Sequence, residues 1–67
     1  NLLSHREFQI LSLIAEGKSN IDISAELKLQ KSTVSTYKKR IMQKLQVDNT
    51  IGLVDAYRTD MNITVRD

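Results

Sequence analysis

Residues 27–47 concentrate the side chains of this 67-residue chain that are best suited to bind a polyanion. This segment holds six basic side chains and no acidic one, whereas the rest of the chain holds four basic and eight acidic side chains. A domain with its excess positive charge on one segment presents a surface to a polyanion, and DNA or RNA is the usual one. A solvated helix face that only keeps the protein soluble is the alternative. The six basic residues are Lys28, Lys31, Lys38, Lys39, Arg40 and Lys44.

Hydroxyl side chains lie between these cations and add hydrogen-bonding capacity. Short hydroxyl groups suit the edges of bases, and cations suit the flanking phosphates. We predict that Ser35, Thr36 and Lys39 contact bases. Phosphate contacts are predicted for Lys31, Ser32, Thr33, Arg40 and Lys44. The hydroxyl of Tyr37 is a further candidate for a phosphate contact, and a purely structural role for its ring is the alternative.

Catalytic chemistry is not expected from this sequence. The chain has one histidine, no cysteine, no clustered carboxylates and no glycine-rich phosphate loop, so we expect neither an enzyme nor a cofactor or metal. No apolar run approaches the roughly 20 residues that cross a membrane, and the absence of cysteine fits a reducing cytoplasm. We therefore expect a cytoplasmic protein. Because the chain starts with Asn1 rather than methionine, we interpret it as the C-terminal part of a longer protein.

The elements that position these side chains are predicted to be helices. Leu, Lys, Gln, Glu and Ala dominate the chain, and proline is absent. We predict an all-α fold, a compact four-helix domain formed by residues 1–67. The predicted helices span residues 5–16, 20–27, 32–46 and 50–58, and residues 59–67 are expected to form a frayed tail.

Capping residues indicate where the helices begin and end. Ser4 and Glu7 have the spacing of a capping box, in which each side chain accepts a backbone N–H of the other residue. Gly17 supplies a left-handed stop for the first helix. Ser19 or Asn20 is expected to cap the second helix.

The third helix is expected to have two different faces. At 3.6 residues per turn, Val34, Ile41 and Leu45 form a narrow apolar seam. Polar side chains lie on the opposite line, namely Ser32, Thr36, Lys39 and Gln43. A short helix, a tight connection and a longer helix with a polar outward face match a helix-turn-helix unit, here residues 19–46.

The spaced pattern of the chain also resembles a known family, the LuxR/NarL/GerE-type helix-turn-helix domain. The resemblance covers residues 3–57, and the stretch 31–38 is most similar to the EvgA/BvgA branch of bacterial two-component response regulators. The matching positions are Leu3-Ser4, Arg6-Glu7, Ile10-Leu11, Ile14-Ala15, Gly17, Ser19-Asn20, Ile23, Leu27, Thr33-Val34, Ile41, Lys44-Leu45 and Val47.

The resemblance implies a function and partners. It implies a sequence-specific double-stranded DNA-binding output domain of a transcription regulator, with the third helix in the major groove and Ser35, Thr36 and Lys39 facing the bases. Ser19 and Asn20 are further DNA-binding candidates. An upstream receiver domain in the full-length protein is implied as well. The fourth helix is implied to pair two copies across a two-fold axis, with Val54 and Tyr57 as candidates, and we expect this self-association to be weak without DNA.

Three positions depart from the family pattern. Gln30 stands where serine is usual, so we expect the recognition helix to take its cap from Ser32 and to begin late. Ser35 replaces a frequent lysine and alters the expected base preference. Ser24 replaces a usual alanine, and its hydroxyl is expected to bond to the preceding turn. The alternative function is a non-enzymatic interaction module that docks an acidic protein partner with its basic helix.

Overall fold

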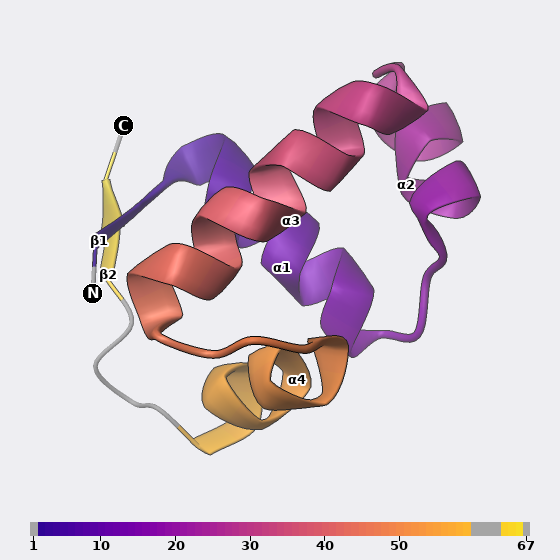
Figure 1. Cartoon of the computed structure of the whole chain (residues 1–67). Helices are drawn as coiled ribbons and strands as arrows, with labels where there is room; N and C mark the ends of the chain where they lie inside the picture. Colours follow the sequence, from indigo (N-terminus) through magenta and orange to yellow (C-terminus); the bar gives the residue numbers. More distant parts are fainter. Residues whose placement is uncertain (1, 60–63, 67) are drawn as a thin grey trace.

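The computed structural model describes residues 2–59 and 64–66, with side chains described for residues 3–59. Four helices carry most of the described chain, which confirms the predicted helical architecture (Figure 1). Their bounds agree with the sequence prediction to within one residue at each end. In chain order the elements are β1 (Leu2–Ser4), α1 (His5–Ala15), α2 (Asn20–Leu27), α3 (Lys31–Leu45), α4 (Thr50–Thr59) and β2 (Thr64–Arg66).

Side-chain caps explain where α1 and α2 begin. The Ser4 hydroxyl accepts the N–H of Glu7 at 3.1 Å, and Glu7 Oε1 accepts the N–H of Ser4 at 2.8 Å, which confirms the capping box. Ser19 and Asp22 form the same reciprocal pair at the start of α2, so Ser19 rather than Asn20 is the cap. Both caps satisfy backbone N–H groups that a helix start leaves without partners.

The start of α3 differs from the prediction. The helix begins at Lys31, after an extended Gln30 whose carbonyl accepts the N–H of Val34 at 3.1 Å. Gln30 makes no side-chain cap, and Ser32 lies inside the first turn, so the expectation of a late start capped by Ser32 is wrong. The cause is the preceding connection, in which Lys28 adopts a left-handed conformation with φ 57° and the N–H of Leu29 bonds the carbonyl of Ser24 at 2.9 Å. After this closed turn the backbone of Gln30 is extended, and α3 begins at the next residue, Lys31.

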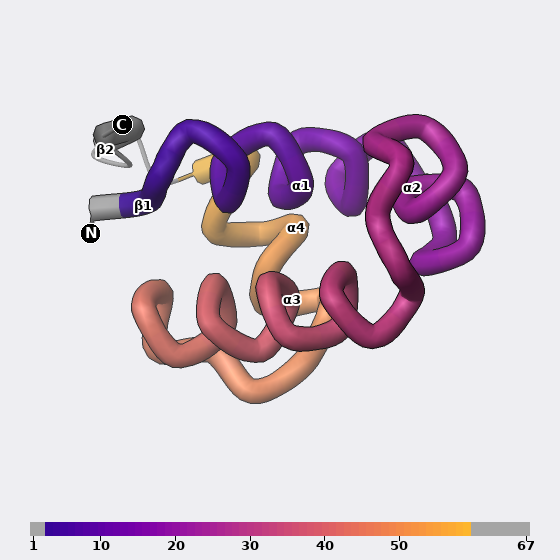
Figure 2. Tube along the Cα trace, turned by 90° about the horizontal axis from the view of Figure 1, so that it is seen from above, coloured from indigo at the N-terminus to yellow at the C-terminus, as the bar shows by residue number. Residues whose placement is uncertain are grey.

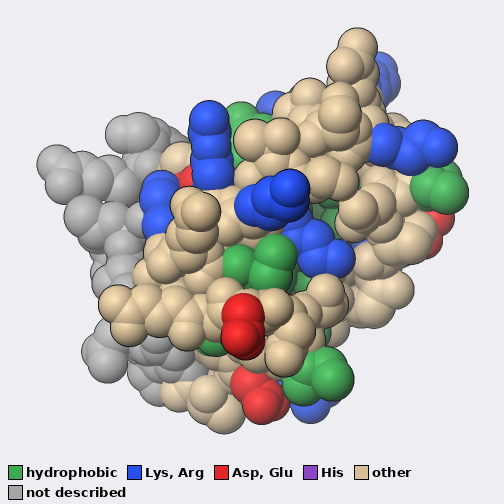
Figure 3. Space-filling model, viewed as in Figure 1, with side chains coloured by type: hydrophobic (Ala, Val, Ile, Leu, Met, Phe, Trp, Pro, Cys, Tyr) green, Lys and Arg blue, Asp and Glu red, His purple; other side chains and the backbone are tan. Residues whose placement is uncertain are grey.

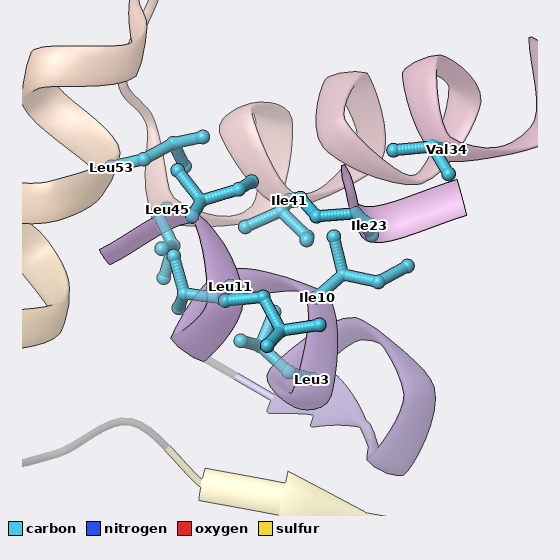
Figure 4. Close-up of a cluster of buried hydrophobic side chains, with 10 residues drawn as sticks. Leu3, Ile10, Leu11, Ile23, Val34, Ile41, Leu45 and Leu53 are labelled. Carbon is cyan, nitrogen blue, oxygen red and sulfur yellow. The ribbon is translucent and has the colours of Figure 1, made fainter. Parts of the chain in front are cut away.

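The core lies between all four helices (Figure 4). Leu3 enters it from β1, Ile23 from α2 and Leu53 from α4, and all three side chains are fully buried. Its remaining buried hydrophobic members are Ile10, Leu11, Leu13 and Ile14 of α1 and Val34, Ile41 and Leu45 of α3. Burial of such side chains is the main favourable term in the folding of a domain this small.

The helices place α3 on one outer side of the molecule. α3 packs against α1 and α2, while α4 packs against α1 and α3. Seen from above, α1 and α3 lie on opposite sides with α2 at one end (Figure 2). In Figure 1 α3 crosses the front of the molecule, so one whole side of this helix faces away from the core.

A short strand pair joins the two ends of the chain. β1 and β2 are parallel, with Leu2 opposite Thr64 and Ser4 opposite Arg66. The predicted frayed tail is therefore wrong for Thr64–Arg66 and for Thr59, which is the last residue of α4, and the rest of that tail lies outside the described residues. β-Branched Thr64 and Val65 favour an extended backbone, and β1 offers backbone groups with which they pair.

Candidate nucleic-acid interface

The two faces of α3 are separated as the helical periodicity predicts. Val34, Ile41 and Leu45 are buried against the other helices, which confirms the apolar seam. The four polar residues on the opposite line are all exposed, namely Ser32, Thr36, Lys39 and Gln43. We call these four residues the outer line of α3. A rigid helix whose outer line carries hydroxyl, amide and ammonium groups has the shape and the chemistry that the major groove accepts.

Cations spread along the same side of the molecule. Lys31, Lys39 and Arg40 are exposed on α3, and Lys38 is half-buried at its edge. Figure 3 shows Lys and Arg side chains over this side, whereas most acidic side chains in that view lie below α3, toward α4, or at the edge beside α2. The positive block of the sequence is therefore a positive side of the folded domain.

A hydrogen bond ties the start of α2 to the first half of α3. The side-chain amide of Asn20, the first residue of α2, donates to the hydroxyl of Ser35 at 3.4 Å. Both residues were candidates for DNA contacts, and the structure brings them together across the helix-turn-helix unit. Ser19, the cap of α2, is exposed beside them.

Two further hydroxyl groups bond within their own helices. Thr36 Oγ1 donates to the carbonyl of Ser32 at 3.0 Å, one turn earlier in α3. Ser24 Oγ donates to the carbonyl of Ile21 at 2.8 Å, as its substitution for alanine led us to expect. Thr33 is half-buried near the start of α3, whereas Ser32 is exposed.

Lys44 has a partner inside the protein. Its Nζ lies 2.7 Å from Oε1 of Glu7, whose residue is 3% exposed, whereas the side chain of Lys44 is 43% exposed. Burial alone would raise the pKa of Glu7. The hydrogen bond and charge of Lys44, together with hydrogen bonds from Ser4, outweigh that effect and hold the pKa of Glu7 below its ordinary value. Glu7 is thus a buried residue and not a solvated one. Lys44, which was predicted to contact phosphate, already has its charge paired with this carboxylate.

Aromatic side chains near α3 and α4 face the core. Tyr37 is half-buried and packs against the hydrophobic cluster, which supports the structural role left open for it. Tyr57 of α4 packs against the same cluster, and its ring centroid lies 5.8 Å from that of Phe8. Val54 is half-buried beside them.

Sequence reasoning missed one residue of α4. Ile51 is 76% exposed, and Ile21 of α2, at 61%, is the other exposed large hydrophobic residue among those with described side chains. Ile51 belongs to the first turn of α4, ahead of the Leu53 and Tyr57 side chains that face inward. The sequence contained a signal for this exposure, because Ile51 is a large hydrophobic residue of the fourth helix that the predicted apolar set of Leu53, Val54 and Tyr57 does not include.

Residues 2–59 and 64–66 contain no pocket and no group of three His, Cys, Asp or Glu residues that could hold a metal ion. None of the described helices is long and apolar enough to cross a membrane. The exposed outer line of α3 and its flanking cations form the candidate functional surface.

Comparison with known proteins shows which family the chain resembles. Residues 1–57 match the family model described as bacterial regulatory proteins, luxR family. The chain is 46% identical over 55 residues to the virulence factors putative positive transcription regulator BvgA of Bordetella pertussis, a match covering 82% of this chain and 26% of that protein. It is 39% identical over 51 residues to the DNA-binding transcriptional activator EvgA of Escherichia coli K12, covering 76% of this chain and 25% of that protein.

A solved structure has the same fold. The crystal structure of response regulator ChrA, from a heme-sensing two-component system, superposes with a TM-score of 0.83 at 38% sequence identity. The match covers 87% of this chain and 29% of that protein. The chain thus spans about a quarter of the length of the curated relatives described above.

Proposed function

Because the chain belongs to the luxR family of bacterial regulatory proteins, we propose that it binds double-stranded DNA sequence-specifically as the output domain of a transcription regulator. The observation that carries this proposal is the division of α3 into a buried seam and an exposed polar outer line. A helix anchored by one face and exposed on the other can enter the major groove without unfolding the domain.

The regulator is proposed to be a response regulator of a bacterial two-component system. The chain covers only about a quarter of its relatives, so a receiver domain upstream in the full-length protein belongs to this proposal. The similarity to a response regulator of known structure and to curated transcription regulators supports it. Such a protein acts in the bacterial cytoplasm, where its DNA lies.

The residues on α3 are proposed to divide into two roles. Ser35, Thr36 and Lys39 contact base edges, since side chains at these positions can reach the floor of the groove. The phosphate contacts come from the flanks of the helix and from the start of α2, namely Ser19, Asn20, Lys31, Ser32, Thr33, Tyr37 and Arg40. Lys44 is assigned chiefly to Glu7, because a cation 2.7 Å from a buried carboxylate loses an ion pair when it turns toward DNA.

Two copies are proposed to pair through α4 on inverted half-sites, weakly in the absence of DNA. The exposed side chain of Ile51 supports this pairing, with half-buried Val54 beside it. Tyr57 is directed to Phe8 and the core, so its part in the interface is secondary. On an inverted-repeat duplex, Ile51→Lys should abolish cooperative binding of the second copy and leave binding to a single half-site unchanged. Equal cooperativity in the wild type and the variant would reject α4 as the pairing surface.

Binding-site selection from a random duplex pool tests the proposal directly. We expect an enriched inverted-repeat sequence that the chain binds more tightly than random duplex. The affinity should fall steeply with salt, by a log–log slope of about −0.9 for each phosphate neutralised. Arg40→Ala should make this slope shallower by about one, whereas Arg58→Ala, an exposed cation on α4, should leave it unchanged on a single half-site.

The alternative is docking of an acidic protein by the basic helix. It predicts that no duplex sequence is enriched and that duplexes of different sequence bind alike at every salt concentration. Such a result would reject sequence-specific DNA binding.

A further inference from the structure

Ser35 and Thr36 are adjacent residues with hydroxyl side chains, and the sequence predicts the same role, a base contact, for both. In the structure their hydroxyl groups form different hydrogen bonds. Ser35 accepts a hydrogen bond from the Asn20 amide at 3.4 Å. Thr36 donates its hydroxyl hydrogen to the carbonyl of Ser32 at 3.0 Å. A hydroxyl group has one hydrogen to donate and two lone pairs that accept. Ser35 therefore keeps its hydrogen for a ligand, whereas Thr36 has already used its own.

This difference decides what Thr36 presents to a groove. Thr36 is exposed on the outer line of α3, between Ser32 and Lys39. With its hydroxyl hydrogen held by the helix backbone, the groups left for a partner are a methyl group and an oxygen that only accepts. Donating to a base acceptor would require Thr36 to break the bond to Ser32. The methyl group and the accepting oxygen are thus the parts of this side chain that can make a contact while the bond to Ser32 stays intact, and the methyl group is the part that Ser35 lacks.

We infer that Thr36 recognises thymine through its 5-methyl group. This inference rests on the proposed DNA-binding function. In the major groove thymine is the one base that presents a methyl group, and an apolar contact such as a threonine methyl distinguishes it from the other bases. Ser35 has the opposite role, because its free hydroxyl hydrogen suits an acceptor such as guanine O6, adenine N7 or thymine O4.

The test removes the methyl group from each partner separately. On the duplex obtained by binding-site selection, each thymine of one half-site is replaced in turn by deoxyuridine, which lacks only the 5-methyl group. The wild-type chain should lose affinity about fourfold at one of these thymines, since burying one methyl-sized group contributes about 0.8 kcal/mol and 1.4 kcal/mol is tenfold.

Two matched variants assign that loss to the methyl group of Thr36. Thr36→Ser keeps the hydroxyl and removes the methyl, so its affinity ratio between thymine and deoxyuridine at that position should fall to about one. Thr36→Val keeps a methyl group and removes the hydroxyl, so its ratio should stay near that of the wild type. Ser35→Ala should weaken binding and leave the ratio unchanged.

Several results would overturn the inference. The inference fails if the selected half-site contains no thymine, or if the wild type loses no affinity when any thymine is replaced by deoxyuridine. It also fails if Thr36→Ser keeps the wild-type affinity ratio between thymine and deoxyuridine, or if Thr36→Val loses it. Circular dichroism verifies that each variant is folded, and a wild-type series without a loss at any thymine overturns the inference even if a variant is not folded. If no sequence is enriched in the selection, the proposed function itself fails, which distinguishes that failure from a failure of methyl recognition.

Discussion

Lys44 of α3 and Ser4 of β1 share one acceptor atom, Oε1 of Glu7, which lies 2.7 Å from the ammonium nitrogen and 2.8 Å from the backbone nitrogen. A single carboxylate therefore caps α1 and holds α3 against it. The acceptor is buried, whereas the side chain of Lys44 is 43% exposed, so the pair joins the core to the surface of the proposed recognition helix. The orientation of α3 depends in part on this residue of α1.

Glu7→Gln should lower the free energy of unfolding by about 1.5–3 kcal/mol at pH 7, the range for a hydrogen bond to a charged group. Glutamine still accepts the N–H of Ser4, because a capping box tolerates glutamine at this position. The loss of stability therefore reports on the charged interaction with Lys44. Urea denaturation measures it. Glu26→Gln, an exposed carboxylate of α2, is the matched control and should change stability by less than about 0.5 kcal/mol. Equal stability of Glu7→Gln and the wild type would mean that the ion pair contributes nothing.

The same pair predicts a pH dependence of stability. Because the pKa of Glu7 in the folded protein lies below the ordinary value of 4.5, the folded state favours the ionised carboxylate. The stabilisation is fully present above the pKa that Glu7 has in the unfolded chain. It is lost as the pH falls through the lower pKa that Glu7 has in the folded protein. The difference in urea midpoint between the wild type and Glu7→Gln should therefore be largest near pH 7 and shrink below about pH 4. A difference that stays constant with acidification would contradict this linkage.

Lys39→Ala and Lys44→Met should separate a DNA contact from a structural contact. Lys39 is exposed on the outer line, so its loss should weaken binding to the selected duplex by about 1–3 kcal/mol and leave the urea midpoint unchanged. Lys44→Met should do the reverse, lowering stability because Glu7 is left buried without its partner. Fluorescence anisotropy and urea denaturation measure the two effects. A shallower salt dependence for Lys44→Met would show that Lys44 also neutralises a phosphate.

Ile41→Ala should damage the fold rather than the interface. Ile41 is fully buried in the seam of α3, and truncation of such a side chain costs about 2–5 kcal/mol. A domain of 67 residues has a total stability of only about 3–10 kcal/mol, so thermal denaturation should show a large loss or no folded state. Ile41→Val should cost about 0.5–1.5 kcal/mol, and Gln43→Ala on the exposed line should be nearly neutral. A neutral Ile41→Ala would contradict the described core.

Features set by neighbours along one helix were predictable from the sequence. The seam of Val34, Ile41 and Leu45 and the capping box at Ser4 follow from helical spacing alone, and both are confirmed. Contacts between distant residues were not predictable. Glu7 and Lys44 are 37 positions apart, and Asn20 and Ser35 are 15 apart, so only the packing of the helices brings them together.

The remaining errors have the same origin. Gln30 has a weak capping side chain, but α3 still begins after it because the turn at Lys28 and Leu29 sets the path of the backbone. The pairing of β1 with β2 joins opposite ends of the chain, which a local reading of the tail does not detect. Tertiary contacts override local preference in both cases.

Gly52→Ala should destabilise the domain although alanine is the better helix former by about 1 kcal/mol. A Cβ at this position would lie 2.8 Å from Cβ of Val47 and 3.3 Å from Oδ1 of Asn49. The Val47 atom is attached directly to the backbone, so the start of α4 would have to move. That movement would disturb the Asn49 cap, which accepts the N–H of Gly52 at 2.7 Å. We expect a loss of about 1–3 kcal/mol, the usual range for overpacking.

Thermal denaturation compares Gly52→Ala with Asp55→Ala, an exposed substitution in the same helix that gains propensity without a clash. If propensity governed both sites, both variants would be stabilised. A lower melting temperature for Gly52→Ala alone would instead show that the close approach of Val47 requires glycine at the first turn of α4. A stabilised Gly52→Ala would mean that the connection between α3 and α4 can shift freely, and the position of α4 against α3 would then not be determined by this contact.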